Sequence, residues 1–169
     1  MIKIVLYEPE KPSNVGNIIR TCNASESSLV IIGPLSFTLD DKALKRAGMD
    51  YIDLAKIKIY PSYEEFLKDY KDKKIFYVTR YSKNVYSSIK VNDPSEEYIF
   101  MFGRESTGIP KEVLKEHLDS TIRIPMAVSA RSLNLSNSVA IVLYEALRQV
   151  NYYGLATTEV IKGEDYLIK

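Results

Sequence analysis

Three short polar segments of this sequence carry side chains that could bind a ligand or stabilise a negative charge. Asn14 to Arg20 contains amides and an arginine, and Gly103 to Gly108 contains two glycines, a carboxylate and hydroxyls. Ser132 to Asn137 alternates amides and hydroxyls with leucines, between apolar segments. Because buried polar groups need hydrogen-bond partners, this third segment either caps the helix that follows or holds a ligand. Its residues alone leave both interpretations open.

The spacing of Gly103 and Gly108 matches the first half of a phosphate-binding loop. Ile109 and Pro110 then stand where that loop requires lysine followed by serine or threonine, which argues against it. No G-x-G-x-x-G pattern follows the first apolar segment, so a classical dinucleotide-binding fold is also disfavoured. Two interpretations of Gly103 remain: an ordinary tight turn, or a glycine that lets a ligand approach the backbone.

The composition is that of an ordinary globular domain. The 169 residues are 46% hydrophobic and 27% charged, with a formal net charge of +1. A single cysteine and a single histidine argue against a Cys/His metal site and allow no internal disulfide, as expected in the reducing cytoplasm. The absence of a signal-peptide pattern and of a membrane-spanning apolar run predicts a cytoplasmic protein that does not enter a membrane. A nucleic acid would have to be bound by a local basic patch.

The alternation of apolar and amphipathic segments predicts an α/β fold with a parallel sheet. The expected strands are apolar on both faces, as in a buried parallel sheet, and span residues 1–6, 29–32, 57–60, 74–79, 98–102 and 122–124. The expected helices span residues 14–24, 40–47, 62–70 and 110–118, and a long last helix begins at Ser136, Asn137 or Ser138 and stops before Gly154. Ligands of such sheets bind beyond the carboxyl ends of the strands, here residues 78–80, 102–105 and 124–126.

The last helix is apolar on more than one face. Val139, Val142 and Leu143 begin the stripe expected to face the sheet, whereas Ala140 and Tyr144 make the first turns apolar on the other side as well. A helix that is apolar all round is buried on two sides. In a chain of this length, the second side predicts contact with another subunit.

Taken together, the polar segments resemble the three motifs of the SPOUT class of RNA methyltransferases. The matching segments are Pro12 to Arg20, FGRESTGIP from Phe102, and RIPM from Arg123 with SLNLSNSVAIVLYEALRQ from Ser132. A further set resembles the TrmL (YibK-like) branch, the tRNA (cytidine/uridine-2′-O)-methyltransferases of the wobble nucleotide: Asp40, Asp41, Leu44, Arg46, Ala47, Gly48, Asp50 and Tyr51. The resemblance extends to about Gly154. One departure is Arg104, where relatives often carry proline.

This resemblance implies a single SPOUT domain over residues 1–169, with a C-terminal tail over about 155–169. The implied fold is a parallel sheet with helices on both faces and a deep trefoil knot in its C-terminal part. The implied cofactor is S-adenosylmethionine, without a metal, and the implied assembly is a homodimer formed through the first and last helices. By the same resemblance, the cofactor-binding residues are Val78, Thr79, Gly103, Ile124, Met126, Ser132 and Leu133.

The implied activity is 2′-O-methylation of a tRNA ribose, with the anticodon stem-loop as partner and the wobble cytidine or uridine as target. Arg20 is expected to stabilise the reacting oxygen, and Asn14 to position Arg20 or the substrate. Glu105 is expected to hold the loop or to orient a partner, and Ser132 and Asn134 are further candidates for the active surface. Two alternatives stay open: an enzyme for ribosomal RNA or another tRNA position, and a non-catalytic module that binds S-adenosylmethionine or RNA. Basic residues expected to converge on the RNA are Lys42, Lys45, Arg46, Arg80, Lys83, Arg104 and Arg131.

Overall fold

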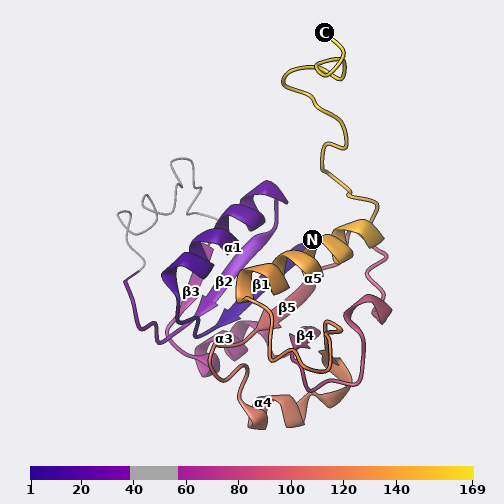
Figure 1. The fold of residues 1–169 in the computed structure, drawn as a ribbon. Coiled ribbons are helices and arrows are strands. Elements are labelled where there is room, and N and C mark those ends of the chain that lie inside the picture. Colours follow the sequence, from indigo (N-terminus) through magenta and orange to yellow (C-terminus); the bar gives the residue numbers. More distant parts are fainter. Residues whose placement is uncertain (39–56) are drawn as a thin grey trace.

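The computed structural model describes residues 1–38 and 57–169, which form a six-stranded sheet with helices against it (Figure 1). All neighbouring strands are parallel, in the order β3-β2-β1-β5-β4-β6. The strands are β1 (Ile2–Tyr7), β2 (Ser28–Ile32), β3 (Ile57–Tyr60), β4 (Ile75–Val78), β5 (Tyr98–Phe102) and β6 (Thr121–Ile122). The predicted α/β class with a parallel sheet is therefore confirmed. The helix expected over 40–47 lies outside the described residues.

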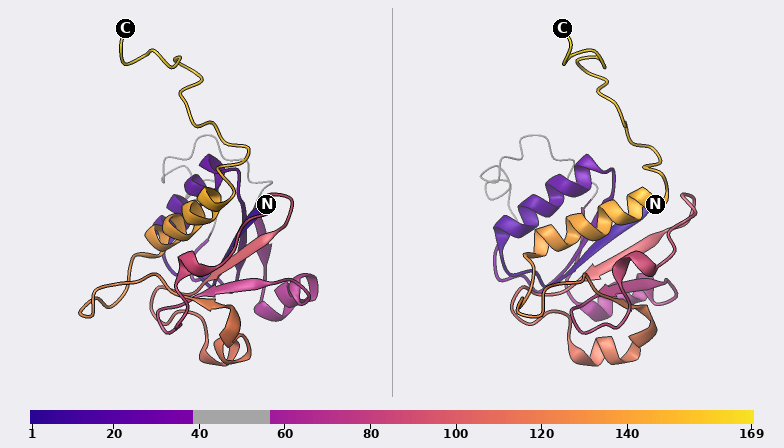
Figure 2. Two further views of the ribbon diagram at one scale, coloured as in Figure 1. Left: turned by 90° about the vertical axis from the view of Figure 1, so that its right-hand side faces the viewer. Right: turned by 45° about the vertical axis from the view of Figure 1, so that its right-hand side comes forward.

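The helices cover both faces of the sheet. They are α1 (Pro12–Ala24), α3 (Tyr63–Tyr70), α4 (Lys111–Glu116) and α5 (Leu135–Gln149), with two short 3-10 turns, η2 (Tyr86–Ser88) and η3 (Leu118–Ser120). Helices α1 and α5 lie side by side on one face, while α3 and α4 lie on the other (Figures 1 and 2). Each face has its own hydrophobic core, so the sheet is buried between two layers.

The central strands β1 and β5 alternate between the two cores residue by residue. Ile4 pairs in register with Phe100, and both side chains join the core beneath α1 and α5. The next pair, Val5 with Met101, joins the opposite core beneath α3 and α4. Each face of a parallel sheet that is covered by helices on both sides must be apolar. The sequences of both strands are therefore almost entirely apolar. Full burial of such side chains stabilises the fold by about 1.5–3 kcal/mol each.

The ends of several elements differ from the predicted ones. Helix α1 begins at Pro12 rather than Asn14, since proline is well suited to a first helical position whose N–H has no partner. Helix α5 begins at Leu135 and is capped by Asn134, so the predicted caps Ser136 to Ser138 are wrong. It also ends at Gln149, five residues before Gly154. The predicted cap at Ser62 is confirmed, because its hydroxyl accepts the Glu65 N–H at 3.3 Å.

The segment after α5 leaves the body of the protein (Figures 1 and 2). Residues 155–169 contain turns and bends but no helix or strand, and Ile161, Leu167 and Ile168 are almost fully exposed. Among the described residues, no helix combines the length and apolar character needed to cross a membrane. The packed part of the molecule thus ends close to the last turn of α5.

Candidate active site

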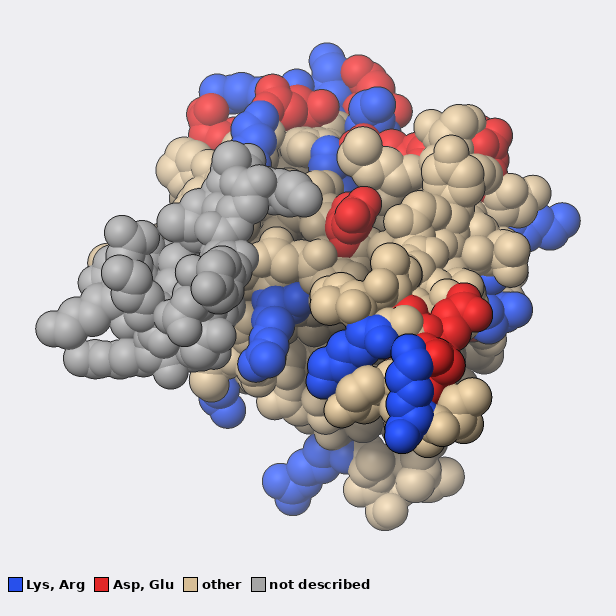
Figure 3. Space-filling model, turned by 90° about the horizontal axis from the view of Figure 1, so that it is seen from above, with Lys and Arg blue, Asp and Glu red and all other residues tan. Residues whose placement is uncertain are grey.

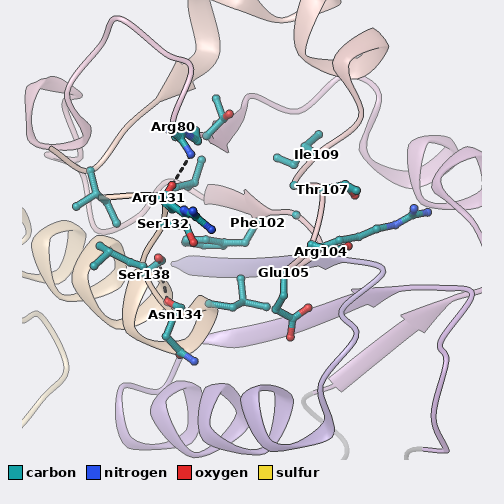
Figure 4. A pocket seen from close by; sticks show the side chains of 18 of the residues that line it. Arg80, Phe102, Arg104, Glu105, Thr107, Ile109, Arg131, Ser132, Asn134 and Ser138 are labelled. Atoms are coloured by element: carbon teal, nitrogen blue, oxygen red, sulfur yellow. Dashed lines mark hydrogen bonds between the residues drawn. The ribbon is translucent and has the colours of Figure 1, made fainter. Parts of the chain in front are cut away.

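The three polar segments meet at the carboxyl ends of β4 and β5, around a cavity of about 540 Å3 (Figure 4). All seven residues that the resemblance implied for the cofactor line this cavity: Val78, Thr79, Gly103, Ile124, Met126, Ser132 and Leu133. Asn14, Glu105 and Asn134 line it as well. Strand ends that are far apart in the sequence therefore converge where a parallel sheet places its ligand sites.

Gly103 is required by the way the loop closes on itself. A Cβ atom at Gly103 would lie 2.1 Å from the carbonyl carbon of Gly108. Arg104 and Gly108 exchange backbone hydrogen bonds of 3.2 and 3.0 Å, and Gly108 has a φ of 74°, which favours glycine. The segment is therefore a tight turn, as one interpretation held, and this turn also forms a wall of the cavity.

The carboxylate of Glu105 fixes this loop against the start of α1. Its Oε2 atom accepts the backbone N–H of Glu10 at 2.8 Å, and its Oε1 atom accepts the backbone N–H of Lys11 at 3.1 Å. Oε1 also accepts the side-chain amide of Asn14 at 2.8 Å. A negative charge beside the first turn of a helix is stabilised by the helix dipole as well as by the hydrogen bonds. Glu105 thus ties the loop to the start of α1.

Asn14 and Asn134 join α1 to α5. Asn134 donates its side-chain amide to Asn14 Oδ1 at 3.0 Å, although 120 residues separate the two in sequence. The other end of the Asn134 side chain accepts the backbone N–H groups of Ser136 at 2.9 Å and Asn137 at 3.3 Å, which caps α5. Asn14 is 4% exposed and so has no water to replace these partners. A continuous hydrogen-bonded chain therefore runs from Glu105 through Asn14 to Asn134, and the polar segment before α5 both caps the helix and lines the cavity.

The opposite wall is the segment that follows β4. The Thr79 N–H donates to the Ile122 carbonyl at 2.8 Å, which continues the pairing of β4 with β6. The Arg80 guanidinium donates to the backbone carbonyl of Arg131, and this bond ties the β4 segment to the loop before α5 (Figure 4). The two segments thereby form a single wall made of strands and loops distant in sequence.

Arg20, expected to be catalytic, does not line the cavity. It is exposed on α1, six residues after Asn14, which corresponds to about 9 Å along the helix axis. Two residues that the sequence did not single out, Lys11 and Tyr81, do line the cavity. Neither belongs to a sequence pattern that would have indicated this position.

The predicted basic residues divide into three groups. Arg80, Arg104 and Arg131 line the cavity, and Lys83 is exposed in the same segment as Arg80. Arg104 forms an ion pair with Glu8, and its guanidinium carbon lies 5.8 Å from the ring centroid of Tyr7. The others, Lys42, Lys45 and Arg46, lie outside the described residues. Seen from above, basic and acidic side chains are intermingled on one face (Figure 3), so the chain has a mixed surface there rather than a field of one sign.

A second contact that holds the loop of residues 103–108 was also not apparent from the sequence. The Glu10 carboxylate accepts the Ser106 hydroxyl at 2.7 Å and the Ser106 backbone N–H at 2.8 Å. The hydrogen bond from the Ser106 hydroxyl, and after it the one from the Ser106 N–H, holds the pKa of Glu10 below its usual value.

Within residues 1–38 and 57–169, no three His, Cys, Asp or Glu side chains are grouped so that they could hold a metal ion. The cavity is lined by the carboxylate of Glu105, the amine of Lys11, arginines, amides, hydroxyls and apolar side chains.

The chain resembles known proteins over most of its length. A family model described as the SpoU rRNA methylase family matches residues 1–144. A protein of Geobacillus stearothermophilus, provisionally named a tRNA (cytidine(34)-2′-O)-methyltransferase, is 47% identical over 155 residues, which cover 92% of this chain and 99% of that protein. The Escherichia coli K12 protein named tRNA (cytidine(34)-2′-O)-methyltransferase is 42% identical over 155 residues, which cover 91% and 97% of the two chains.

Solved structures agree with the sequence relatives. A provisionally named RNA methyltransferase of Bacillus anthracis superposes with a TM-score of 0.88 at 48% identity and covers 95% of this chain and 100% of its own. A structure described as giving insight into 2′-OH methylation of C/U34 on tRNA superposes with a TM-score of 0.81 at 36% identity, covering 89% and 97%. AviRb of Streptomyces viridochromogenes, solved with AdoMet, has a TM-score of 0.71 at 25% identity and covers 87% and 59%. The chain therefore belongs to the SpoU rRNA methylase family.

Proposed function

We propose that this protein transfers a methyl group from S-adenosylmethionine to the ribose 2′-oxygen of the wobble cytidine or uridine of a tRNA. Membership of the family and the tRNA-modifying relatives named above support this activity. The observation that carries it is the convergence of Glu105, Asn14 and Asn134, one from each motif, on a single cavity. Because tRNA is its substrate, we place the enzyme in the cytoplasm.

The cavity fits S-adenosylmethionine in size and in chemistry. Its volume of about 540 Å3 lies within the range of roughly 300–1,000 Å3 that small-molecule sites occupy. Val78, Ile124 and Leu133 offer apolar contacts for an adenosine and a thioether chain, while Thr79 and Ser132 offer hydroxyls. The bound cofactor supplies a methyl group on a sulfonium. The protein has to hold that group in line with the ribose oxygen, which lowers the barrier by roughly 7–11 kcal/mol when the alignment is good.

During transfer the ribose oxygen forms a bond to the methyl carbon, the methyl–sulfur bond breaks, and the hydroxyl proton passes to solvent. The oxygen therefore carries negative charge as the reaction proceeds. We assign the stabilisation of this oxygen to Arg20, because a guanidinium stays protonated and stabilises developing charge. Asn14 and Asn134 orient the substrate beside the cavity, and Glu105 holds both the loop and Asn14 in place. The three groups connect through hydrogen bonds, so a change at one of them is expected to displace the others.

The position of Arg20 outside its own cavity suggests that the site is completed by a second subunit. We propose a homodimer formed through α1 and α5. Tyr144, on the side of α5 away from the core, is 45% exposed, and Ile141 beside it is only half-buried, as expected for a surface that a partner covers. In this dimer, Arg20 acts on the ribose held at the cavity of the other protomer. We also propose that residues 1–169 form one SPOUT domain, with the knot of this class between β4 and α5 and residues 155–169 as a tail.

The primary test is methyl transfer from labelled S-adenosylmethionine to unmodified tRNA and, in a parallel reaction, to unmodified ribosomal RNA, followed by mapping of the labelled nucleotide. Label at the wobble ribose supports the proposed function. Label elsewhere in tRNA or only in ribosomal RNA supports the alternative enzyme, and cofactor binding without transfer supports a binding module. An Arg20→Ala variant that binds cofactor yet keeps transfer within about threefold of wild type would show that Arg20 is not catalytic.

Mixed dimers test whether Arg20 acts across the interface. Arg20→Ala and Asn134→Ala chains are unfolded and refolded together, so that half of the dimers contain one chain of each kind. If Arg20 serves the partner's cavity, each mixed dimer has one intact site, and the mixture regains about a quarter of wild-type activity. If Arg20 serves its own cavity, every site is defective and the mixture stays as inactive as either variant.

A further inference from the structure

Tyr81 is a large aromatic side chain exposed at the edge of the cavity. It is 78% exposed and lines the cavity next to Arg80. Other strongly exposed tyrosines in the described chain lie elsewhere: Tyr144 on α5, and Tyr153 and Tyr166 beyond its end. An apolar ring left in water gains free energy when a partner covers it. A partner that covered Tyr81 would approach from the solvent side of the cavity.

The backbone that carries the ring is held in place by hydrogen bonds of Tyr81 and its neighbours. On one side, the Arg80 guanidinium is anchored to the Arg131 carbonyl. On the other side, Ser82 is 5% exposed and its hydroxyl donates to the Thr121 carbonyl at 2.8 Å. The Tyr81 N–H also donates to Thr79 Oγ1 at 3.4 Å. Because the backbone at Tyr81 is anchored on both sides, a ligand need not order this segment of the chain when it binds, which lowers the entropic cost of binding.

The charges around Tyr81 are those that an RNA strand requires. The Arg80 guanidinium carbon lies 5.7 Å from the centroid of the Tyr81 ring, close enough for a cation–π contact. Arg80 and Arg131 line the cavity, and Lys83 is exposed two residues after Tyr81. Single-stranded RNA is bound by aromatic rings that stack on bases and by basic groups that contact the phosphates between them.

We propose that Tyr81, with Arg80 beside it, is a stacking platform for an unpaired base of the RNA substrate next to the nucleotide being methylated. The inference rests on the proposed function, since it assumes that the substrate is an RNA with unpaired bases. The adenine ring of the cofactor is the competing occupant. The exposure of Tyr81 favours the RNA, because a ring that contacts a buried cofactor would face the interior of the cavity.

A direct test uses the absence of tryptophan from this sequence. A Tyr81→Trp variant carries a single tryptophan whose emission is quenched when a base stacks on it. Tyr166→Trp is a matched control, because Tyr166 is also exposed and has Lys162 Nζ 4.5 Å from its ring centroid. An RNA hairpin with the anticodon loop is expected to quench the Tyr81→Trp protein and leave the Tyr166→Trp protein unchanged. Equal quenching of both proteins, or quenching of neither, would overturn the proposal.

Kinetics separate a stacking role from a structural one. Tyr81→Ala is expected to raise the KM for RNA by about fivefold to 150-fold, the range for loss of one base-stacking contact. Tyr81→Phe keeps a stacking ring and should restore most of this affinity, and the loss in Tyr81→Ala should fall on KM rather than on kcat. Tyr166→Ala, which lies outside the site, should leave both KM and kcat within about twofold of wild type. An unchanged RNA KM in Tyr81→Ala, or weaker binding of S-adenosylmethionine in its place, contradicts the assignment. If the wild-type protein methylates no RNA, the proposed function fails, and the tryptophan emission still decides whether a base stacks on position 81.

Discussion

Replacing Glu105 by glutamine tests the chain of hydrogen bonds that joins the three motifs. The carboxylate accepts three N–H groups, from Glu10, Lys11 and Asn14, through its two oxygens. Glutamine has one oxygen and one amide group in their place. If its oxygen takes the Oε1 position, the Glu10 N–H faces another donor. If it takes the Oε2 position, both Lys11 and Asn14 lose their acceptor.

The expected loss of stability follows from this count. At least one hydrogen bond to a charged acceptor disappears, and such bonds contribute about 1.5–3 kcal/mol each. The charge beside the start of α1 is lost as well, at about 0.3–1 kcal/mol. Since Glu105 is half-buried and water replaces part of the loss, we expect the free energy of unfolding to fall by about 2 kcal/mol. For a domain of this size, that corresponds to a fall in Tm of about 4–8 °C.

Thermal unfolding and calorimetric titration with S-adenosylmethionine measure the two consequences. Cofactor affinity should fall with stability, because the displaced loop forms a wall of the cavity. Glu112→Gln is the matched control, because it also removes a carboxylate at the start of a helix, in the first turn of α4. Within the described residues, the Glu112 side chain makes no hydrogen bond. A Glu105→Gln protein whose Tm and cofactor affinity equal those of the control would refute the role assigned to the carboxylate.

Two further predictions concern the packing around the site. Gly103→Ala places a Cβ atom 2.1 Å from the backbone of Gly108, so the loop must open. Calorimetry should then show at least about tenfold weaker cofactor binding. Gly33→Ala, whose Cβ meets nothing closer than 3.4 Å, is the control and should bind the cofactor as wild type does. Burial raises the pKa of the Cys22 thiol to about 12, so its thiolate fraction at pH 8 is on the order of a thousandfold below that of an exposed thiol. Iodoacetamide should therefore modify Cys22 only after unfolding, and rapid labelling of the native protein would contradict the packing of α1.

The sequence was sufficient to predict the layers of the fold. Strands such as β1 and β5 are apolar on both faces, and that pattern occurs where helices cover a parallel sheet on both sides. The rule that ligands bind beyond the carboxyl ends of such strands then predicted which strand ends meet. Thr79, Gly103 and Ile124 accordingly line one cavity.

The local chemistry of the helix ends was less predictable. Ser136, Asn137 and Ser138 are all good N-cap residue types, and sequence alone could not distinguish them from Asn134. The selection came from tertiary structure, because Asn134 also donates to Asn14 on α1 and so satisfies both ends of its amide. A side chain with two partners outcompetes neighbours that can only cap.

What the sequence by itself determined is therefore the order of elements, the sheet they form and the edge at which the motifs meet. Tertiary structure alone decided that Asn14 is buried between Glu105 and Asn134, that Arg20 lies outside the cavity, and that Tyr81 stands exposed at its edge. The physical reason is that periodicity reports the burial of side chains within one element, whereas the positions of Asn14 and Tyr81 depend on contacts between segments 51 to 120 residues apart in sequence.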